Sequence, residues 1–228
     1  MSDSPVVLIH GFGTSYKSTW VDNGWTALLE DAGRRVIGVD LLGHGDAEKP
    51  EDPYEYDNLE SVALEAFPSE PVDAIGFSMG ATVLLHLALQ APDRFKRLVV
   101  AGIGSNLFEK DENFRESIVE AVKTGAASTP ELRYFAQLPE APNANRPALA
   151  AFLQRPNPPK ISKYLLASLK IPVLVVIGEN DFTYPADELI ESLPNSKLVV
   201  LPKTDHFATP KNFTFIDSAL TFLEAQPF

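Results

Sequence analysis

A serine flanked by two glycines, Gly76-Phe77-Ser78-Met79-Gly80, stands at the junction of two apolar runs. The run before it, Val72 to Phe77, fits a buried strand, and the run after it, Ala81 to Ala91, fits a helix. This arrangement is typical of a nucleophile elbow, a sharp turn that holds a serine side chain at its apex. A Cβ at either flanking position would collide with the neighbouring strand or helix, so both positions need glycine. Taken alone, the motif is more often an ordinary turn, and its meaning depends on the rest of the chain.

The alternation of apolar runs predicts an α/β fold with a parallel sheet, because strand and helix patterns follow one another along most of the chain. Six runs rich in β-branched residues or leucine fit buried parallel strands: Val6–His10, Arg35–Asp40, Val72–Phe77, Arg97–Gly102, Val173–Gly178 and Lys197–Leu201. Helices are predicted at Trp20–Ala32, Asn58–Phe67, Met79–Ala91, Ala186–Leu193 and Asn212–Ala225. The 228 residues are enough for one domain with a large core.

The alternation of strand and helix patterns stops between the fourth and fifth predicted strands, where Gly104–Ser168 contains no strand candidate. Helical stretches are predicted there at Asn113–Lys123, Pro130–Leu138 and Pro147–Leu153. A long insertion without strands in a compact α/β domain is usually functional, for example as a lid. Its many aromatic and aliphatic residues argue against the alternative, a disordered linker. We therefore expect residues 104–168 to form a helical cap inserted in a single domain of residues 1–228.

The composition excludes several classes of protein. The chain has no cysteine, which excludes a disulfide scaffold, a thiolate nucleophile and a cysteine-ligated metal site. The N-terminal residues are acidic, and the apolar run that follows ends at His10, too short for a signal sequence. No stretch approaches the roughly 18 apolar residues of a membrane span. We expect a soluble, cytoplasmic protein with no membrane partner.

Most of the net charge of −12 comes from one segment, Asp46–Asp73, which contains ten carboxylates and only one cation, Lys49. Such a surface repels phosphate backbones, so nucleic acid is not an expected partner. A solvated acidic face is the favoured interpretation, and a docking site for a basic partner is the alternative.

A serine hydroxyl becomes a useful nucleophile when a histidine accepts its proton and an acid orients that histidine. Four histidines are available: His10, His44, His86 and His206. The first two lie in early glycine-rich turns, and His86 lies two turns into the helix after Ser78, pointing away from it. His206 follows the last predicted strand, where a loop could return over the carboxyl edge of the sheet, so it is the candidate base.

The candidate acid is Asp181, which follows the fifth predicted strand directly and so shares the carboxyl edge of the sheet with Ser78. Asp205 adjoins His206, but the side chains of neighbouring residues usually diverge. An acid after the fourth strand is ruled out because residues 101–105 contain no carboxylate. The sequence thus predicts Ser78, Asp181 and His206 as nucleophile, acid and base.

Ester cleavage also needs hydrogen-bond donors that stabilise the negative charge developing on the carbonyl oxygen. Each donor stabilises the transition state by roughly 3 kcal/mol. One donor is expected to be the backbone N–H of Met79, at a helix N-terminus. The other is expected from the turn His10-Gly11-Phe12-Gly13, with the N–H of Phe12 as the best candidate. The alternative is a plain glycine-rich turn, but a phosphate loop is excluded because neither glycine-rich phosphate motif occurs in the chain.

Together these motifs resemble the α/β-hydrolase superfamily in its small, capped form. Five matches occur in the family's order: His10 to Gly13, Asp40 to Gly45 with Pro50, Gly76 to Gly80, Gly178 to Pro185, and Asp205 to Phe207. The resemblance implies a catalytic triad of Ser78, Asp181 and His206, an oxyanion hole from Phe12 and Met79, and largely structural roles for His10 and His44. It also implies the α/β-hydrolase fold, here with about six mostly parallel strands, because the antiparallel pair with which the family usually begins is missing. Ala47 departs from the serine that relatives often carry after the Gly-His-Gly turn.

The function expected from these residues is hydrolysis of a small carboxylic ester through an acyl-enzyme on Ser78, with no cofactor and no metal. Thioesters, lactones and carbon–carbon bonds next to a carbonyl are alternatives for the same residues, as is the cofactor-free perhydrolase or haloperoxidase activity of the family. A ligand-binding protein on the same fold is an alternative of another class. The partner is expected to be a small acyl substrate, held in a small apolar pocket that favours short to medium acyl chains.

Overall fold

The computed structural model describes residues 4–109, 111–156 and 160–226. Their strands form one sheet in the order β2-β1-β3-β4-β5-β6, and every neighbouring pair is parallel. The strands are β1 (Val6–Ile9), β2 (Val36–Val39), β3 (Val72–Phe77), β4 (Phe95–Ala101), β5 (Val173–Gly178) and β6 (Ser196–Leu201). All six predicted strands are present, and the parallel sheet predicted from the alternation of strands and helices is confirmed.

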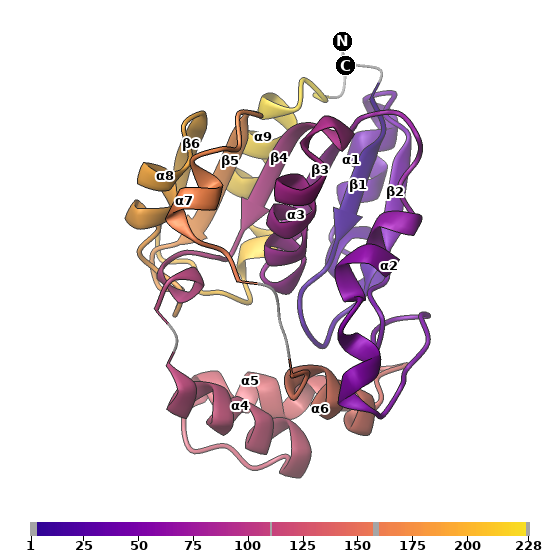
Figure 1. The fold of residues 1–228 in the computed structure, drawn as a ribbon, viewed down its shortest axis with the longest axis vertical. Helices are drawn as coiled ribbons and strands as arrows, with labels where there is room; N and C mark the ends of the chain where they lie inside the picture. The colour runs from indigo at the N-terminus through magenta and orange to yellow at the C-terminus, as the bar shows by residue number, and fades with distance from the viewer. Residues whose placement is uncertain (1–3, 110, 157–159, 227–228) are drawn as a thin grey trace.

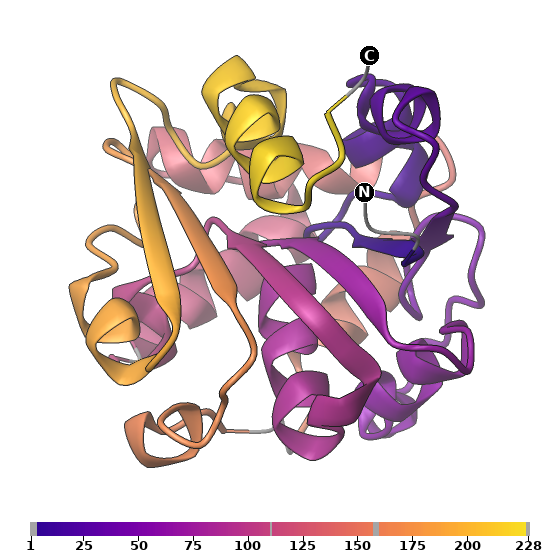
Figure 2. The same ribbon diagram turned by 90° about the horizontal axis from the view of Figure 1, so that it is seen from above.

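Helices cover both faces of the sheet, as Figures 1 and 2 show. One face is covered by α2 (Leu59–Glu65), α3 (Met79–Gln90), α7 (Lys163–Leu166) and α8 (Asp187–Ser192), the other by α1 (Trp25–Asp31) and α9 (Phe213–Phe222). Successive strand residues point to opposite faces, so Val7 and Ile9 belong to the first core and Val6 and Leu8 to the second. Burial on both faces explains why the strands are continuous apolar runs rather than alternating ones.

The helix predicted at Trp20–Ala32 is wrong in its first half. Lys17–Val21 forms one turn of π-helix, and α1 begins only at Trp25. Gly24 separates them with a φ of +82°, in the left-handed region that glycine adopts at little cost. Trp20 and Trp25 are both fully buried with their rings edge to face, 5.2 Å apart. The two rings therefore pack together in one core, although they lie on two separate helical segments.

The described residues of 104–168, which we call the insertion, contain no strand. They form α4 (Glu112–Thr124), α5 (Pro130–Gln137) and α6 (Arg146–Leu153), which lie beyond the carboxyl ends of the strands in Figure 1, and α7, which packs on the sheet. The side chains of Asp111, Thr129 and Asn145 accept hydrogen bonds from the first turns of α4, α5 and α6. These N-caps stabilise three short helices that have little sheet to pack against.

The helices of the described residues are short. The longest, α4, has 13 residues, whereas a helix that crosses the hydrocarbon core of a bilayer needs about 20. No helix in the described part of the chain combines the length and the apolar character of a membrane span.

Candidate active site

The turn between β3 and α3 holds Ser78 in a strained conformation, with a φ of +52°. A Cβ on Gly76 would come within 2.7 Å of the backbone nitrogen of Ala81, and one on Gly80 within 2.3 Å of the Ile9 carbonyl oxygen. Both glycines are therefore required by close backbone approach, as the sequence predicts. The turn projects Ser78 at the carboxyl edge of the sheet.

The structure brings Ser78, His206 and Asp181 into one chain of hydrogen bonds. Ser78 Oγ lies 2.9 Å from His206 Nε2, and His206 Nδ1 lies 2.9 Å from Asp181 Oδ2 and 3.0 Å from Oδ1. A carboxylate only accepts, so the ring proton belongs on Nδ1, and Nε2 is left to accept the hydrogen bond of the serine hydroxyl. The three side chains come from the loops after β3, β5 and β6, far apart in the sequence.

Asp181 is held by a residue that the sequence analysis did not single out. The backbone N–H and the hydroxyl of Thr183 both donate to Asp181 Oδ1, each at 2.8 Å. Thr183 is 1% exposed, and Asp181 is 5% exposed. An aspartate followed two residues later by a threonine is the spacing of an Asx turn, so the signal is present in the sequence.

Asp205, the alternative acid, does not join this chain. Its side chain is exposed, and Oδ1 accepts a hydrogen bond of 2.8 Å from the backbone N–H of Ala208. It therefore stabilises the turn that follows His206, in keeping with the expectation that adjacent side chains diverge.

Aromatic rings enclose the His206 imidazole, which is 3% exposed. The ring of Phe182 lies 4.4 Å from it and that of Phe77 4.9 Å, while Phe207 approaches edge-on at 5.3 Å. These rings keep water away from the hydrogen bond between His206 and Asp181, which strengthens it.

The loop after β1 lies against the elbow. A Cβ on Gly11 would come within 2.8 Å of Phe77 Cδ1, and one on Gly80 within 2.6 Å of the His10 carbonyl oxygen. On the other side, α3 begins at Met79 without a side-chain N-cap from Ser78. The first N–H groups of a helix carry partial positive charge, so this corner suits a developing oxyanion.

His10 and His44 are buried and support the loop after β1. His10 Nδ1 donates to the Gly11 carbonyl at 2.8 Å, and Nε2 accepts from the Leu41 N–H at 3.1 Å. His44 Nδ1 donates to the Leu42 carbonyl at 3.0 Å. Burial lowers the pKa of both imidazoles, that of His44 to about 3. Both rings are therefore neutral hydrogen-bonding groups at neutral pH.

The low pKa of His44 predicts loss of stability in acid. The unfolded chain binds a proton on His44 below its ordinary pKa of 6.5, whereas the folded protein resists protonation down to about pH 3. The free energy of unfolding should therefore fall between pH 6.5 and 4.5, and His44 should account for about 2 kcal/mol of that fall. Urea unfolding of the wild type and of His44→Phe at both pH values measures it. An equal fall in both proteins would contradict the assignment.

Rings of the insertion contact the aromatic residues beside the site. Phe114 from α4 lies 5.8 Å from Phe182, and Tyr134 from α5 stacks on Phe207 at 4.1 Å. Phe135 from α5 lies 6.0 Å from Phe182 and 5.8 Å from Phe207, and Phe152 from α6 stacks on Phe12 at 5.6 Å. The rings of the insertion thus meet those beside His206 and those of the loop after β1. These rings form one apolar cluster next to His206.

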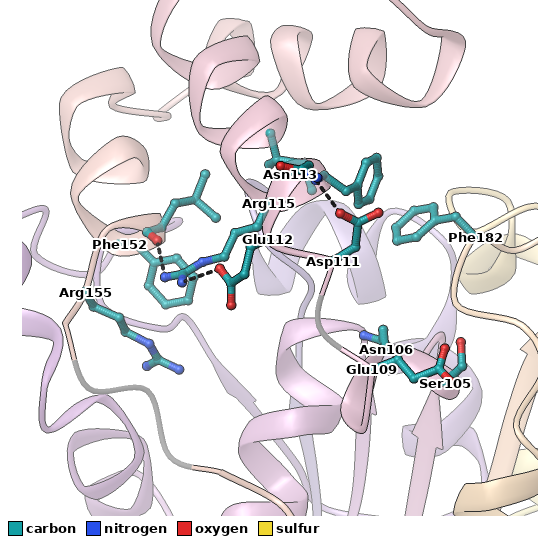
Figure 3. Close-up of a pocket in the computed structure, with 13 residues that line it drawn as sticks. Ser105, Asn106, Glu109, Asp111, Glu112, Asn113, Arg115, Phe152, Arg155 and Phe182 are labelled. Atoms are coloured by element: carbon teal, nitrogen blue, oxygen red, sulfur yellow. Dashed lines mark hydrogen bonds and ion pairs between the residues drawn. The ribbon is translucent and has the colours of Figure 1, made fainter.

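A cavity of about 1000 Å³ opens between the insertion and the body, beyond these rings (Figure 3). Phe152 and Phe182 line it on the side of the candidate site, and Asn106, Arg115 and Arg155 are among its polar lining residues. The sequence predicts a small apolar pocket above Ser78. The cavity differs from that expectation. It is large and partly charged, because residues at the ends of α4 and α6 carry ionic side chains toward it, and Ser78 is not among its lining residues.

A metal site needs several ligating side chains in one place. Among the described residues, no group of three or more histidine or carboxylate side chains is arranged to hold an ion.

Comparison with known proteins identifies the family. The sequence profile described as "Alpha/beta hydrolase family" matches residues 6–214. The chain is 36% identical over 104 residues to a 2-hydroxymuconate semialdehyde hydrolase from Pseudomonas sp. (strain CF600), an alignment that covers 43% of this chain and 36% of that protein. It is 29% identical to a pimeloyl-[acyl-carrier protein] methyl ester esterase from Neisseria meningitidis serogroup A, covering 83% of this chain and 71% of that protein.

A solved structure supports the same assignment. A bromoperoxidase from Bacillus anthracis superimposes with a TM-score of 0.74 at 25% identity, covering 98% of this chain and 92% of that one. The superposition spans the sheet, its helices and the insertion, since almost the whole chain is covered. The fold is thus shared along the full length of the described residues.

Proposed function

The chain belongs to the alpha/beta hydrolase family, and from that premise we propose that it is a serine hydrolase that cleaves a small carboxylic ester. The observation that carries the proposal is the unbroken chain of hydrogen bonds from Ser78 through His206 to Asp181, with each link between 2.9 and 3.0 Å. Nucleophilic catalysis by serine requires this order of groups.

In the first half of the reaction, Ser78 Oγ attacks the acyl carbonyl carbon while His206 Nε2 takes the hydroxyl proton. Asp181 stabilises the imidazolium that results and keeps it oriented. The negative charge on the former carbonyl oxygen is received by the backbone N–H groups of Phe12 and Met79. Collapse of this intermediate breaks the ester bond, and His206 gives its proton to the leaving alcohol.

In the second half, a water molecule repeats the same steps on the acyl-enzyme. His206 Nε2 takes a proton from the water as its oxygen attacks the acyl carbon, and then returns that proton to Ser78 Oγ. The products are a carboxylic acid and the free enzyme. The insertion acts as a cap in this scheme, because the rings of Phe135 and Phe152 close over the acyl group and exclude bulk water.

The family also contains other chemistries that these residues could perform. Thioesters, lactones and carbon–carbon bonds next to a carbonyl suit the same nucleophile, and relatives are named as a semialdehyde hydrolase and as a bromoperoxidase. Ester hydrolysis is favoured because the relative aligned over 83% of this chain is named as a methyl ester esterase. A ligand-binding protein on the same fold is the alternative of another class.

A series of p-nitrophenyl esters with acyl chains from acetate to palmitate tests the proposal. Each buried methylene contributes about 0.8 kcal/mol until the ring cluster is filled. Activity is therefore expected to rise from acetate, to peak at short to medium chains and to fall for long ones. A protein that only binds ligands would show at most one slow turnover per molecule. A maximum at triglyceride-length chains would contradict the proposed cap.

A further inference from the structure

Arg155 is one of the residues that line the cavity, and Figure 3 shows its guanidinium there. The side chain is 11% exposed, and its guanidinium carbon lies 5.0 Å from the centre of the Phe152 ring. Nη1 approaches Glu60 Oε1 at 3.4 Å. Among the described residues, no other hydrogen-bond acceptor is found for a group that carries five N–H donors.

The positive charge at this end of the cavity is incompletely balanced. Glu60 is the only carboxylate paired with Arg155 in the described part of the chain, and their 3.4 Å contact is longer than a strong charge-assisted hydrogen bond. A second guanidinium, that of Arg115, also lines the cavity, and its Nη2 donates to the Leu153 carbonyl at 3.0 Å. Burial lowers the pKa of Arg155, and the charge of Arg115 lowers it further, whereas Glu60 and Asp57 raise it. A buried cation of this kind is stabilised by an added anion.

The carboxylates that line the same cavity lie toward solvent. Glu109, Asp111 and Glu112 are exposed, and the side chain of Glu112 is 61% exposed. Asp111 Oδ1 is already engaged as the N-cap of α4, where it accepts from the N–H of Phe114. Solvation and salt screen such exposed charges, so they weaken the field at Arg155 only slightly. They would, however, repel a ligand with several negative charges.

Two rings that line the cavity also contact residues of the candidate active site. Phe152 stacks on Phe12, and the ring of Phe182 lies 4.4 Å from the imidazole of His206, tilted against it. A ligand that extended from Ser78 along these two rings would reach the part of the cavity that Arg155 lines. Its apolar part would then lie near the serine and its far end near a cation.

We propose that Arg155 binds a carboxylate of the substrate, so that the ester cleaved at Ser78 is a small one that carries a single free carboxylate at its far end. The inference rests on the proposed function and adds the substrate class to it. The apolar middle of the substrate lies along the rings of Phe152 and Phe182. The unused donors of Arg155 form a charge-assisted pair with the carboxylate, which is shielded there from bulk water.

The test compares charged and neutral esters of the same length. Monomethyl esters of linear dicarboxylic acids with four to eight carbons are paired with methyl esters of the matching monocarboxylic acids, and butyrate esters of ω-hydroxy acids place the carboxylate on the alcohol side. Hydrolysis is followed by pH-stat titration. We expect one charged series to exceed its neutral partner at least about 10-fold in kcat/KM, as for hydrogen bonds to charged groups.

The variants separate recognition from a purely structural role. Arg155→Met should lower the ratio of charged to neutral kcat/KM by about 10- to 100-fold, through KM, and Arg155→Lys should restore part of it. Glu60→Gln removes the competing carboxylate and should raise the ratio. Arg133→Met, which removes an exposed arginine of α5 outside the cavity lining, is the matched control and should leave the ratio unchanged.

A role limited to pairing Glu60 predicts the opposite pattern. Arg155→Met and Glu60→Gln would then lower the hydrolysis rates of charged and neutral esters together, and would lower Tm as well. In addition, no charged series would be preferred. Either result overturns the proposal.

A binding measurement tests the proposed subsite independently of ester hydrolysis. Monomethyl adipate carries one carboxylate and cannot be hydrolysed by Ser78→Ala. It should bind this variant in calorimetry and lose at least about 10-fold in affinity in the double variant with Arg155→Met. Absence of binding would overturn the subsite even if esters are hydrolysed, and binding without turnover would overturn the hydrolase alone.

Discussion

Replacing Ser78 with alanine is expected to lower kcat by about 10⁴-fold or more, because the serine, the histidine and the acid act as a unit. The variant loses the attacking oxygen, and no neighbouring side chain can replace it, since the rings of Phe182 and Phe207 carry no nucleophile. The residual rate would come from the oxyanion donors and from binding alone. Hydrolysis of the best p-nitrophenyl ester in the series measures the effect.

The fold should survive this change. Among the described residues, Ser78 makes its side-chain hydrogen bond only to His206, and alanine fits the same space at the apex of the turn. Its Cβ meets the same strain at φ +52° as that of serine, so Tm should change by only a few degrees. Circular dichroism and thermal melting are the controls. A variant that folds and keeps more than a tenth of the wild-type activity would show that Ser78 is not the nucleophile.

Asp181→Asn is expected to reduce kcat by about 10⁴-fold, as the equivalent change does in other serine triads. Thr183 donates twice to Oδ1 of residue 181, so the amide oxygen of the asparagine would stay on Thr183 and its NH₂ group would face His206 Nδ1. An NH₂ group donates, and His206 would have to carry its proton on Nε2. The imidazole could then no longer accept the proton of Ser78.

Asp205→Asn is the matched control for this prediction. It also replaces an aspartate, one residue from His206, but the Asp205 side chain accepts its hydrogen bond from the backbone N–H of Ala208 on the exposed side of the turn. An asparagine oxygen can accept that bond equally well, so activity should stay near the wild-type value. The opposite ranking of the two variants, with Asp205→Asn impaired and Asp181→Asn active, would transfer the role of the acid to Asp205.

The positions of the strands along the chain and the edge of the sheet on which the site lies could be predicted from local sequence. A buried parallel strand is a short apolar run of sequence. The turns that follow such runs contain glycine or aspartate, as at Gly76-Phe77-Ser78-Met79-Gly80 and at Asp181. Carboxyl ends of parallel strands meet on one edge, so residues that follow different strands can be placed together without knowing any contact. Ser78, Asp181 and His206 were predicted in this way, and the structure places them within hydrogen-bonding distance.

The local sequence pattern gave a wrong or incomplete prediction where a residue's role depends on tertiary packing. Trp20 and Trp25 were both assigned to one predicted helix, yet Gly24 separates the two helical segments that carry them, and both rings fill the same core. Thr183 was overlooked for a related reason. Its spacing from Asp181 is common to many turns, and only the fold shows that the acceptor is the carboxylate that holds His206.

The sequence by itself determined the parallel sheet, its covering helices, the strained elbow at Ser78 and the identity of the residues that join it, because each depends on neighbours along the chain or on a strand end. Only the tertiary structure decided the shape and the charge of the cavity. Arg155 and Glu60 are 95 residues apart, and their pairing in a partly buried place depends on how α6 lies against α2. The pattern of apolar and polar residues along the chain cannot predict this ion pair. Its energy depends on burial and on charges from distant segments, and not on local secondary-structure propensity.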